Sequence, residues 1–122
     1  MKTELNLADF LNASIANQVK EATEANFLGR FVEFKTSELA LFAKKLGIVL
    51  KDTEPTKIGR VLDVSINALG EVEVYVEFGR MIEGSYTYLE PEDKFFMCDI
   101  VITISPDRGW KPELNFSPYK GR

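Results

Sequence analysis

The sequence contains no histidine, and this absence removes several classes of chemistry. Histidine is the commonest general base near neutral pH, the base of Ser-His-Asp triads and a common zinc ligand. The single cysteine, Cys98, lies inside an apolar run, which is typical of a buried and unreactive thiol. The glycine fingerprints of phosphate-binding loops and dinucleotide sites are also missing. We therefore expect a protein that is not an enzyme and needs no cofactor.

Long hydrophobic runs are missing as well. No stretch approaches the roughly 20 apolar residues that span a bilayer. The first residues, "MKTELNLADFLNAS", mix acids with apolar residues, unlike a signal peptide. One cysteine permits no intramolecular disulfide, which suits a reducing compartment. These features predict a cytoplasmic protein with no membrane partner.

Positive charge is in short supply. The chain has 15 Lys and Arg against 19 Asp and Glu, a net charge of −4. Residues 71–99 hold eight acids against Arg80 and Lys94, a local charge of −6. Binding to nucleic acid needs a basic footprint, so we expect none. A small anionic ligand is still possible, because a few local arginines can hold one.

The length of 122 residues predicts a single domain, 1–122. The residue pattern predicts two helices near its N-terminus. Residues 5–25 read as the first helix. A second helix begins with Thr36 or Ser37 as its cap and ends at Gly47, where a left-handed residue belongs. The stripe that recurs every four residues in the first helix is Leu7, Leu11, Ile15 and Val19, continued by Ala22.

The rest of the chain favours strands. Residues 27–34 predict a short strand, and period-two alternation then begins after the linker "KDTEPT". In "RVLDVSI" we expect Leu62, Val64 and Ile66 on one face. In "EVEVYVEF" the valines and Phe78 share one face, and "NALG" forms the hairpin turn between the two strands. "SYTYL" and residues 95–104 predict further strands, before a proline-containing tail. The expected fold is α+β: two N-terminal helices packed on a twisted antiparallel sheet of about four to five strands, with an irregular C-terminal tail.

A glycine-arginine pair recurs in "NFLGRFVEF", "TKIGRVLDV" and "EFGRMIEG". Glycine can open a strand with a bulge, and arginine suits a sheet edge. Alternatively, glycine lets a ligand approach the backbone, and the adjacent guanidinium matches phosphate oxygens. Arg30 and Arg60 are the candidates for this second role. In "PDRGW", Arg108 adds a cation and Asp107 could accept a hydrogen bond from a ribose hydroxyl.

Aromatic residues would supply the other half of a nucleotide site. Tyr86 and Tyr88 share one face of their strand, and Tyr75 lies on the outer face of its neighbour. Stacked aromatics together with arginines on phosphate are what a small nucleotide needs.

The chain resembles the phage anti-Thoeris sponge proteins of the first described kind. The resemblance rests on the order of the elements and on "FLGRFVEFKTSELALFAKKLG", "IGRVLDVSINALGEVEVYVEFG", "LEPEDKFFMCDI" and "PDRGW". That family sequesters the cyclic ADP-ribose isomers made by bacterial TIR-domain immune sensors. The resemblance implies a non-catalytic homo-oligomer, a dimer or a multiple of dimers, acting in the host bacterial cytosol. It implies that Arg30, Arg60 and Arg108 bind the ligand, with Phe78, Tyr86 or Tyr88 as the aromatic.

A protein-binding module is the alternative. "IGRVLDV", "GEVEVYVEF" and "SYTYLEPED" follow one another like the strands and turns of a small SH3-like barrel. In this interpretation the tyrosines and acids form a peptide-binding surface, and the arginines are edge residues.

Overall fold

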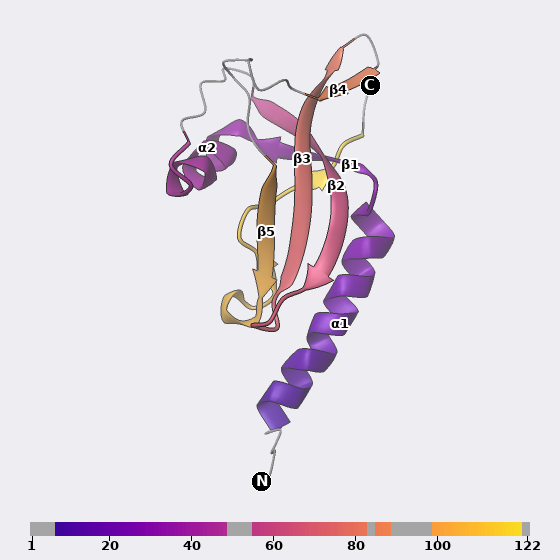
Figure 1. Ribbon diagram of the computed structural model, residues 1–122, viewed down its shortest axis with the longest axis vertical. Helices are drawn as coiled ribbons and strands as arrows, with labels where there is room; N and C mark the ends of the chain where they lie inside the picture. Colours follow the sequence, from indigo (N-terminus) through magenta and orange to yellow (C-terminus); the bar gives the residue numbers. More distant parts are fainter. Residues whose placement is uncertain (1–6, 49–54, 83–84, 89–98, 121–122) are drawn as a thin grey trace.

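The computed structural model describes residues 7–48, 55–82, 85–88 and 99–120, with the backbone alone for residues 8–9, 79–82 and 85–88. Three segments precede the main sheet: α1 (Leu7–Phe27), β1 (Phe31–Lys35) and α2 (Thr36–Lys45). The strands that follow are β2 (Thr56–Ile66), β3 (Val72–Ile82), β4 (Ser85–Tyr88) and β5 (Ile100–Ser105). A short 3-10 turn, η1 (Pro106–Arg108), leads to two brief strands, β6 (Lys111–Pro112) and β7 (Ser117–Pro118) (Figure 1).

The strands form one antiparallel, curled sheet. Its order is β6-β5-β3-β2-β1-β7, and β4 pairs with β3 off this path, which makes seven strands among the described residues. Only residues 113–116 separate β6 from β7, so the two ends of the sheet lie within about 18 Å of each other along the chain. The α+β class is confirmed, with more strands than the four to five expected.

The C-terminal segment is part of this sheet, and the expectation of an irregular tail was wrong. It pairs with β5 through β6 and with β1 through β7. Leu114 is buried, and the Phe116 ring lies 5.1 Å from that of Phe27 and 5.9 Å from that of Phe34. These apolar contacts draw the segment across the sheet despite its prolines.

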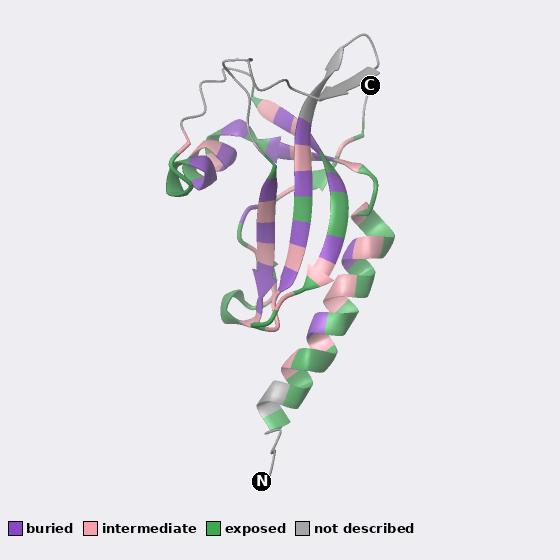
Figure 2. Cartoon of the chain, in the orientation of Figure 1, coloured by how far each residue is buried: buried purple, intermediate pink, exposed green. Residues whose placement is uncertain are grey.

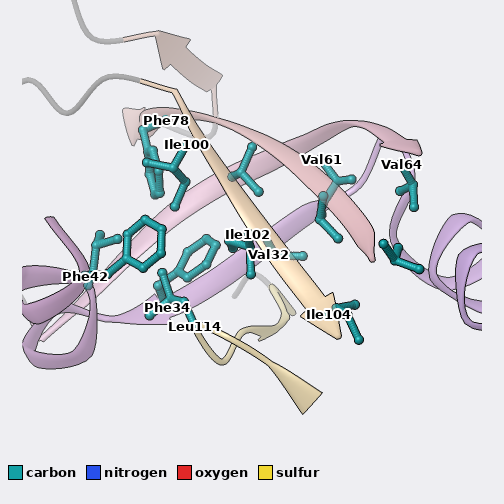
Figure 3. Close-up of a cluster of buried hydrophobic side chains, with 14 of the residues drawn as sticks. Val32, Phe34, Phe42, Val61, Val64, Phe78, Ile100, Ile102, Ile104 and Leu114 are labelled. Carbon is teal, nitrogen blue, oxygen red and sulfur yellow. The ribbon is translucent and has the colours of Figure 1, made fainter. Parts of the chain in front are cut away.

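The core lies on the concave side of the sheet. Inward residues alternate along the strands, as the buried bands in Figure 2 show. Phe34 and Phe78 meet there with ring centroids 5.4 Å apart, and α2 adds Leu39 and Phe42 (Figure 3). The described core residues are Ala16, Val32, Phe34, Leu39, Phe42, Ala43, Val61, Val64, Val72, Val74, Val76, Phe78, Ile100, Ile102, Ile104 and Leu114.

One strand departs from simple alternation. The pairing of β2 with β3 shifts register between Val61 and Asp63, which is a β-bulge at Leu62. Val61 and Val64 are therefore both buried, while Leu62 and Ile66 are exposed. The expectation that Leu62 shares a face with Val64 and Ile66 was wrong, because the extra residue flips the faces after it. Val64 and Ile66 do share a face, opposite Val74 and Val72, and Ile66 is 36% exposed at the end of the strand.

Helix α1 occupies the place that β1 leaves open. Along β2, β1 pairs with Thr56–Arg60 alone, and α1 lies along the remainder of β2 (Figure 1). The helix presents Ala16 and Thr23 to the sheet, with Val19 and Phe27 partly buried against the core. The expected stripe was wrong at Leu7, Leu11 and Ala22, which are exposed. The strand expected over 27–34 begins only at Phe31, because α1 continues to Phe27.

The second helix and the hairpin match the sequence more closely. α2 ends in a turn with Gly47 at φ +78°, where Ile48 N donates to Ala43 O. Its N-cap is Lys35, with no side-chain hydrogen bond, so the expected Thr36 or Ser37 cap was wrong. The "NALG" turn is confirmed: the Asn67 side chain accepts from Leu69 N and Glu71 N. Neither of these described helices has the length and hydropathy needed to cross a membrane. The first four residues of the strand expected over 95–104 lie outside the described ranges.

Candidate functional site

The glycines of the glycine-arginine pairs have different structural causes. Gly29 ends α1 with φ +75°, and nothing lies within 4 Å of where its Cβ would be. Gly59 is buried within β2, and a Cβ there would lie 2.5 Å from Val76 Cγ1 and 3.3 Å from Phe34 Cε1. Helix termination therefore accounts for one glycine, and core packing accounts for the other. Gly79, of the third pair, lies inside β3 opposite Ile58 and Tyr88.

The two arginines that follow Gly29 and Gly59 nevertheless lie on adjoining, paired segments. Gly29 N donates to Val61 O at 2.8 Å, and Val61 N donates to Arg30 O at 3.1 Å. These bonds set Gly29 and Arg30 both opposite Val61, a β-bulge that begins with the positive-φ glycine, while Arg60 is opposite Phe31. Both arginines are exposed. The antiparallel pairing of two distant segments thus brings the backbones of Arg30 and Arg60 to one end of the sheet, with Arg60 opposite Phe31 and Arg30 beside Val61.

Arg60 has a weak partner in its own sheet. Its Nε lies 4.0 Å from Glu77 Oε1, and Glu77 is the residue opposite it on β3. The Arg60 side chain is 45% exposed, so water screens this pair. The guanidinium therefore has donors that an incoming anion could use.

Two aromatic residues flank this end of the sheet. Phe31 is directly opposite Arg60, on the outer face, because its neighbour Val32 is fully buried on the inner face. On the other side of β1, Tyr119 N donates to Phe31 O at 3.0 Å, and Lys120 follows. Both rings are half-buried. We call this set the arginine end: Arg30, Phe31, Arg60, Tyr119 and Lys120.

Arg108 and Asp107 lie elsewhere in the fold. Arg108 Nη2 donates to Thr103 O at 2.7 Å and to Thr103 Oγ1 at 2.6 Å, and its Nε donates to Lys111 O at 3.4 Å. Thr103 is opposite Glu73, four residues along β3 from Glu77, or about 13 Å along the strand. Within one chain, therefore, Arg108 and its exposed neighbour Asp107 do not join Arg30 and Arg60. The described bonds of Arg108 fasten the η1 turn to β5.

The three aromatic residues expected to stack on the ligand, Phe78, Tyr86 and Tyr88, do not share one environment. Phe78 is only 1% exposed and packs on Phe34 in the core, so it has no surface on which a base could stack. Its place follows from strict alternation along β3, which puts it on the same face as the three buried valines. Tyr86 and Tyr88 lie on β4 with only their backbone described, so their side chains are outside the described part of the chain.

The middle of the outer sheet face is acidic and carries one exposed tyrosine. Tyr75 is 39% exposed, lies between Asp63 and Val101, and donates from its hydroxyl to Glu73 Oε1 at 3.3 Å. The Glu73 carboxylate is the main cause that raises the pKa of Tyr75, with partial burial and Asp63 adding to it. This surface favours a cationic group over an anionic one. No group of three or more Asp, Glu, Cys or His side chains in the described ranges is arranged to hold a metal ion.

Three members of the arginine end were not singled out in the sequence. Phe31 directly follows the first glycine-arginine pair, so its adjacency to Arg30 was visible. Tyr119 and Lys120 belong to a proline-containing tail, and only the β1–β7 pairing brings them to Phe31. No family model, curated protein or solved structure matches this chain.

Proposed function

We propose that the protein binds a cyclic ADP-ribose-type nucleotide at the arginine end and holds it without converting it. In this proposal it is a phage anti-defence protein that sequesters an immune signal in the host cytoplasm. The observation that carries it is the pairing of the two segments at this end of the sheet: Val61 N, which follows Arg60, donates to Arg30 O, and Arg60 is opposite Phe31, which follows Arg30. Two exposed arginines on adjoining backbone segments supply the two guanidinium groups that the two phosphates of such a ligand call for.

The residues around the arginines suit the other parts of the ligand. Phe31 and Tyr119, neighbours across β1 and β7, offer ring surface for a base. The carboxylate of Glu77, beside Arg60, can accept a hydrogen bond from a ribose hydroxyl. The same carboxylate also repels phosphate, so Glu77 lowers the affinity for phosphate itself. It thereby favours ligands that carry hydroxyl groups as well as phosphates.

Binding without turnover is consistent with the residue types in the chain. It has no histidine to act as a general base, and the titratable groups proposed to contact the ligand are arginines, a lysine, a tyrosine and the Glu77 carboxylate, which is next to Arg60. Tight binding of the ground state serves sequestration, whereas catalysis needs tighter binding of the transition state. Fixed cations and ring surfaces act equally on both states.

Calorimetric titration with cyclic ADP-ribose isomers tests this proposal. Each charge-assisted bond from a guanidinium to phosphate contributes about 1.5–3 kcal/mol, so Arg60→Ala should weaken binding roughly ten- to hundredfold. Arg30→Ala should have a similar effect. Lys44→Ala, which removes an exposed charge from α2, is the matched control and should change affinity less than twofold. Equal losses in Arg60→Ala and Lys44→Ala would show that only general charge matters, and would contradict a site at the arginine end.

A peptide-binding module remains the second candidate, supported by the exposed Tyr75 among acids. Asp63 lies opposite Tyr75, and Glu73 accepts its hydroxyl. A tyrosine ring next to carboxylates suits a lysine- or arginine-containing peptide. Fluorescence anisotropy with a labelled basic peptide tests it. Binding that is lost in Tyr75→Ala and retained in Arg60→Ala would favour this function over nucleotide sequestration.

The proposal also includes self-association as a dimer or a multiple of dimers. Among the described residues, the surface that best supports it is the exposed apolar start of α1.

A further inference from the structure

The N-terminal half of α1 has no packing partner in its own chain among the described residues. It projects past the β2–β3 hairpin, while the C-terminal half lies along β2 (Figure 1). Its large side chains are exposed: Leu7 72%, Phe10 58% and Leu11 49%. From Ala16 onward the helix buries a different face against the core, the one carrying Thr23. The helix thus carries two apolar faces, and only one of them is covered by the sheet.

The second face has the composition of a helix–helix contact. No charged residue occurs from Phe10 to Val19, although 28% of the whole chain is charged. Ser14 follows Leu11 by three residues and Leu7 by seven, so the small Ser14 continues the stripe on the same side of the helix. A small residue beside large ones lets a second helix approach closely. An exposed helix face normally carries charges for solubility, and their absence here favours a covered surface.

We propose that the α1 stripe of Leu7, Phe10, Leu11 and Ser14 is a self-association surface whose occupant is the same stripe of a second copy, packed antiparallel across a two-fold axis. Two copies each carry a net charge of −4 and repel one another generally. The uncharged half of α1 is a place where they can meet without that repulsion. In an antiparallel pair the two helix dipoles point in opposite directions, which is favourable. The two sheets then lie at opposite ends of the helix pair.

The area sets the strength of this dimer. The three exposed side chains present on the order of 300 Å² per copy, and the exposed small and polar residues between them bring the total to roughly 500 Å². That is about 1,000 Å² for both copies, the lower limit for a specific interface. We therefore expect a reversible dimer that dissociates in the micromolar range, and not an obligate one.

The arrangement has a consequence for ligand binding. The arginine end lies beyond the C-terminal end of α1, where Gly29 and Arg30 follow the helix. An antiparallel pair built on the N-terminal halves keeps the two arginine ends apart. Each copy would then hold ligand by itself, one per chain, so this self-association does not depend on the proposed ligand and can be tested without it.

Sedimentation velocity of the full chain from 1 to 100 µM is the experiment. The wild type should show a concentration-dependent monomer–dimer equilibrium, and Leu11→Glu should weaken dimerisation at least tenfold by placing two like charges in the contact. Leu41→Glu is the matched control, because Leu41 is 67% exposed on α2, and it should dimerise like the wild type. Thermal melts of both variants at 1 µM show that the fold is retained, since both side chains are exposed.

Direction is tested by cross-linking. In a Cys98→Ser background, an equimolar mixture of Leu7→Cys and Ser14→Cys should form a disulfide-linked heterodimer under mild oxidation, because the antiparallel stripes place Leu7 of one copy opposite Ser14 of the other. Ser14→Cys alone should not cross-link, because its two copies lie about 10 Å apart along the helix axes, beyond the reach of a disulfide. A Ser14→Cys homodimer would show a parallel pair and would overturn the proposed direction. A wild-type chain that stays monomeric at 100 µM would overturn the proposal. So would a dimer that Leu11→Glu leaves unchanged, because association would then use another surface.

Discussion

Gly59→Ala should destabilise the protein strongly, because the space for a methyl group is already filled. The new Cβ would lie 2.5 Å from Val76 Cγ1, 3.1 Å from Glu77 O and 3.3 Å from Phe34 Cε1. Carbon atoms pack best at about 3.5–4.0 Å, so the first contact is shorter than that by about 1 Å. Val76 and Phe34 are each 1% exposed, and Glu77 O belongs to the β3 backbone, so none of the three can move without disturbing the core or the ladder.

The expected cost of Gly59→Ala is about 2–3 kcal/mol of unfolding free energy, the upper part of the range for overpacked cores. In a domain of this size, roughly 3–5 °C of Tm follows each kcal/mol, so the melting temperature should fall by about 6–15 °C. Chemical denaturation followed by circular dichroism gives the free energy. Gly29→Ala is a useful comparison, because its Cβ meets nothing within 4 Å and only its φ of +75° is unfavourable, at about 1–2 kcal/mol.

A double-mutant cycle identifies the cause. Val76→Ala removes Cγ1, the nearest atom, so Gly59→Ala should cost at least about 1 kcal/mol less in that background. If Gly59→Ala is as stable as the wild type, or costs the same with and without Val76→Ala, the packing explanation for this glycine is refuted. A role for Gly59 in ligand approach would then need to be considered again.

Three further outcomes are expected. Phe78→Ala should lose about 3–5 kcal/mol of unfolding free energy in denaturant titration, because Phe78 is fully buried against Phe34; a loss below 1 kcal/mol would contradict its place in the core. Arg108→Ala should raise hydrogen exchange at Gly109 and Trp110 without weakening nucleotide binding, since its described bonds go to Thr103 and Lys111; lost binding would return Arg108 to the site. The pKa of Tyr75 is raised above 10.0, chiefly by Glu73, so the folded state binds this proton more tightly and stability from Tyr75 is present below pH 10 and lost as pH rises further. In an ultraviolet titration Glu73→Gln should lower this pKa, and an unchanged pKa would contradict the assigned cause.

Local periodicity predicted the parts of the fold that depend on near neighbours. The alternation of β3 placed Val72, Val74 and Val76 inside correctly, because one buried face requires period two. The "NALG" turn and the Gly47 helix end were equally visible, since each depends on a few adjacent residues. The same alternation placed Phe78 on the valine face, and this should have removed it from the list of stacking candidates.

Local patterns could not predict features that depend on distant pairing. In β2, Val61, Leu62, Val64 and Ile66 are all apolar, so the sequence allows either face, and the bulge at Leu62 decides between them. The tail looked irregular because of its prolines, yet Pro112 and Pro118 lie in two-residue strands at opposite ends of the sheet path, where the missing N–H costs little.

The candidate site shows the same limit. Arg30 and Arg60 were selected for the residues around them, and the β1–β2 pairing brings their backbones to the same end of the sheet. Arg108 was selected on the same grounds, but in one chain it lies near the far end of β5, bonded to Thr103. Residue type alone could not show which of these arginines lie close together, because the distances between them are set by strand order and register.

The most direct test of nucleotide sequestration is a capture-and-release assay. Excess protein is mixed with one cyclic ADP-ribose isomer at a time, the filtrate is analysed, and the retained protein is then heat-denatured and its supernatant examined by liquid chromatography and mass spectrometry. The account predicts that one isomer disappears from the filtrate and returns chemically unchanged after denaturation, and that Arg60→Ala leaves it in the filtrate. An altered product would make the protein an enzyme, and no depletion of any isomer would contradict nucleotide binding.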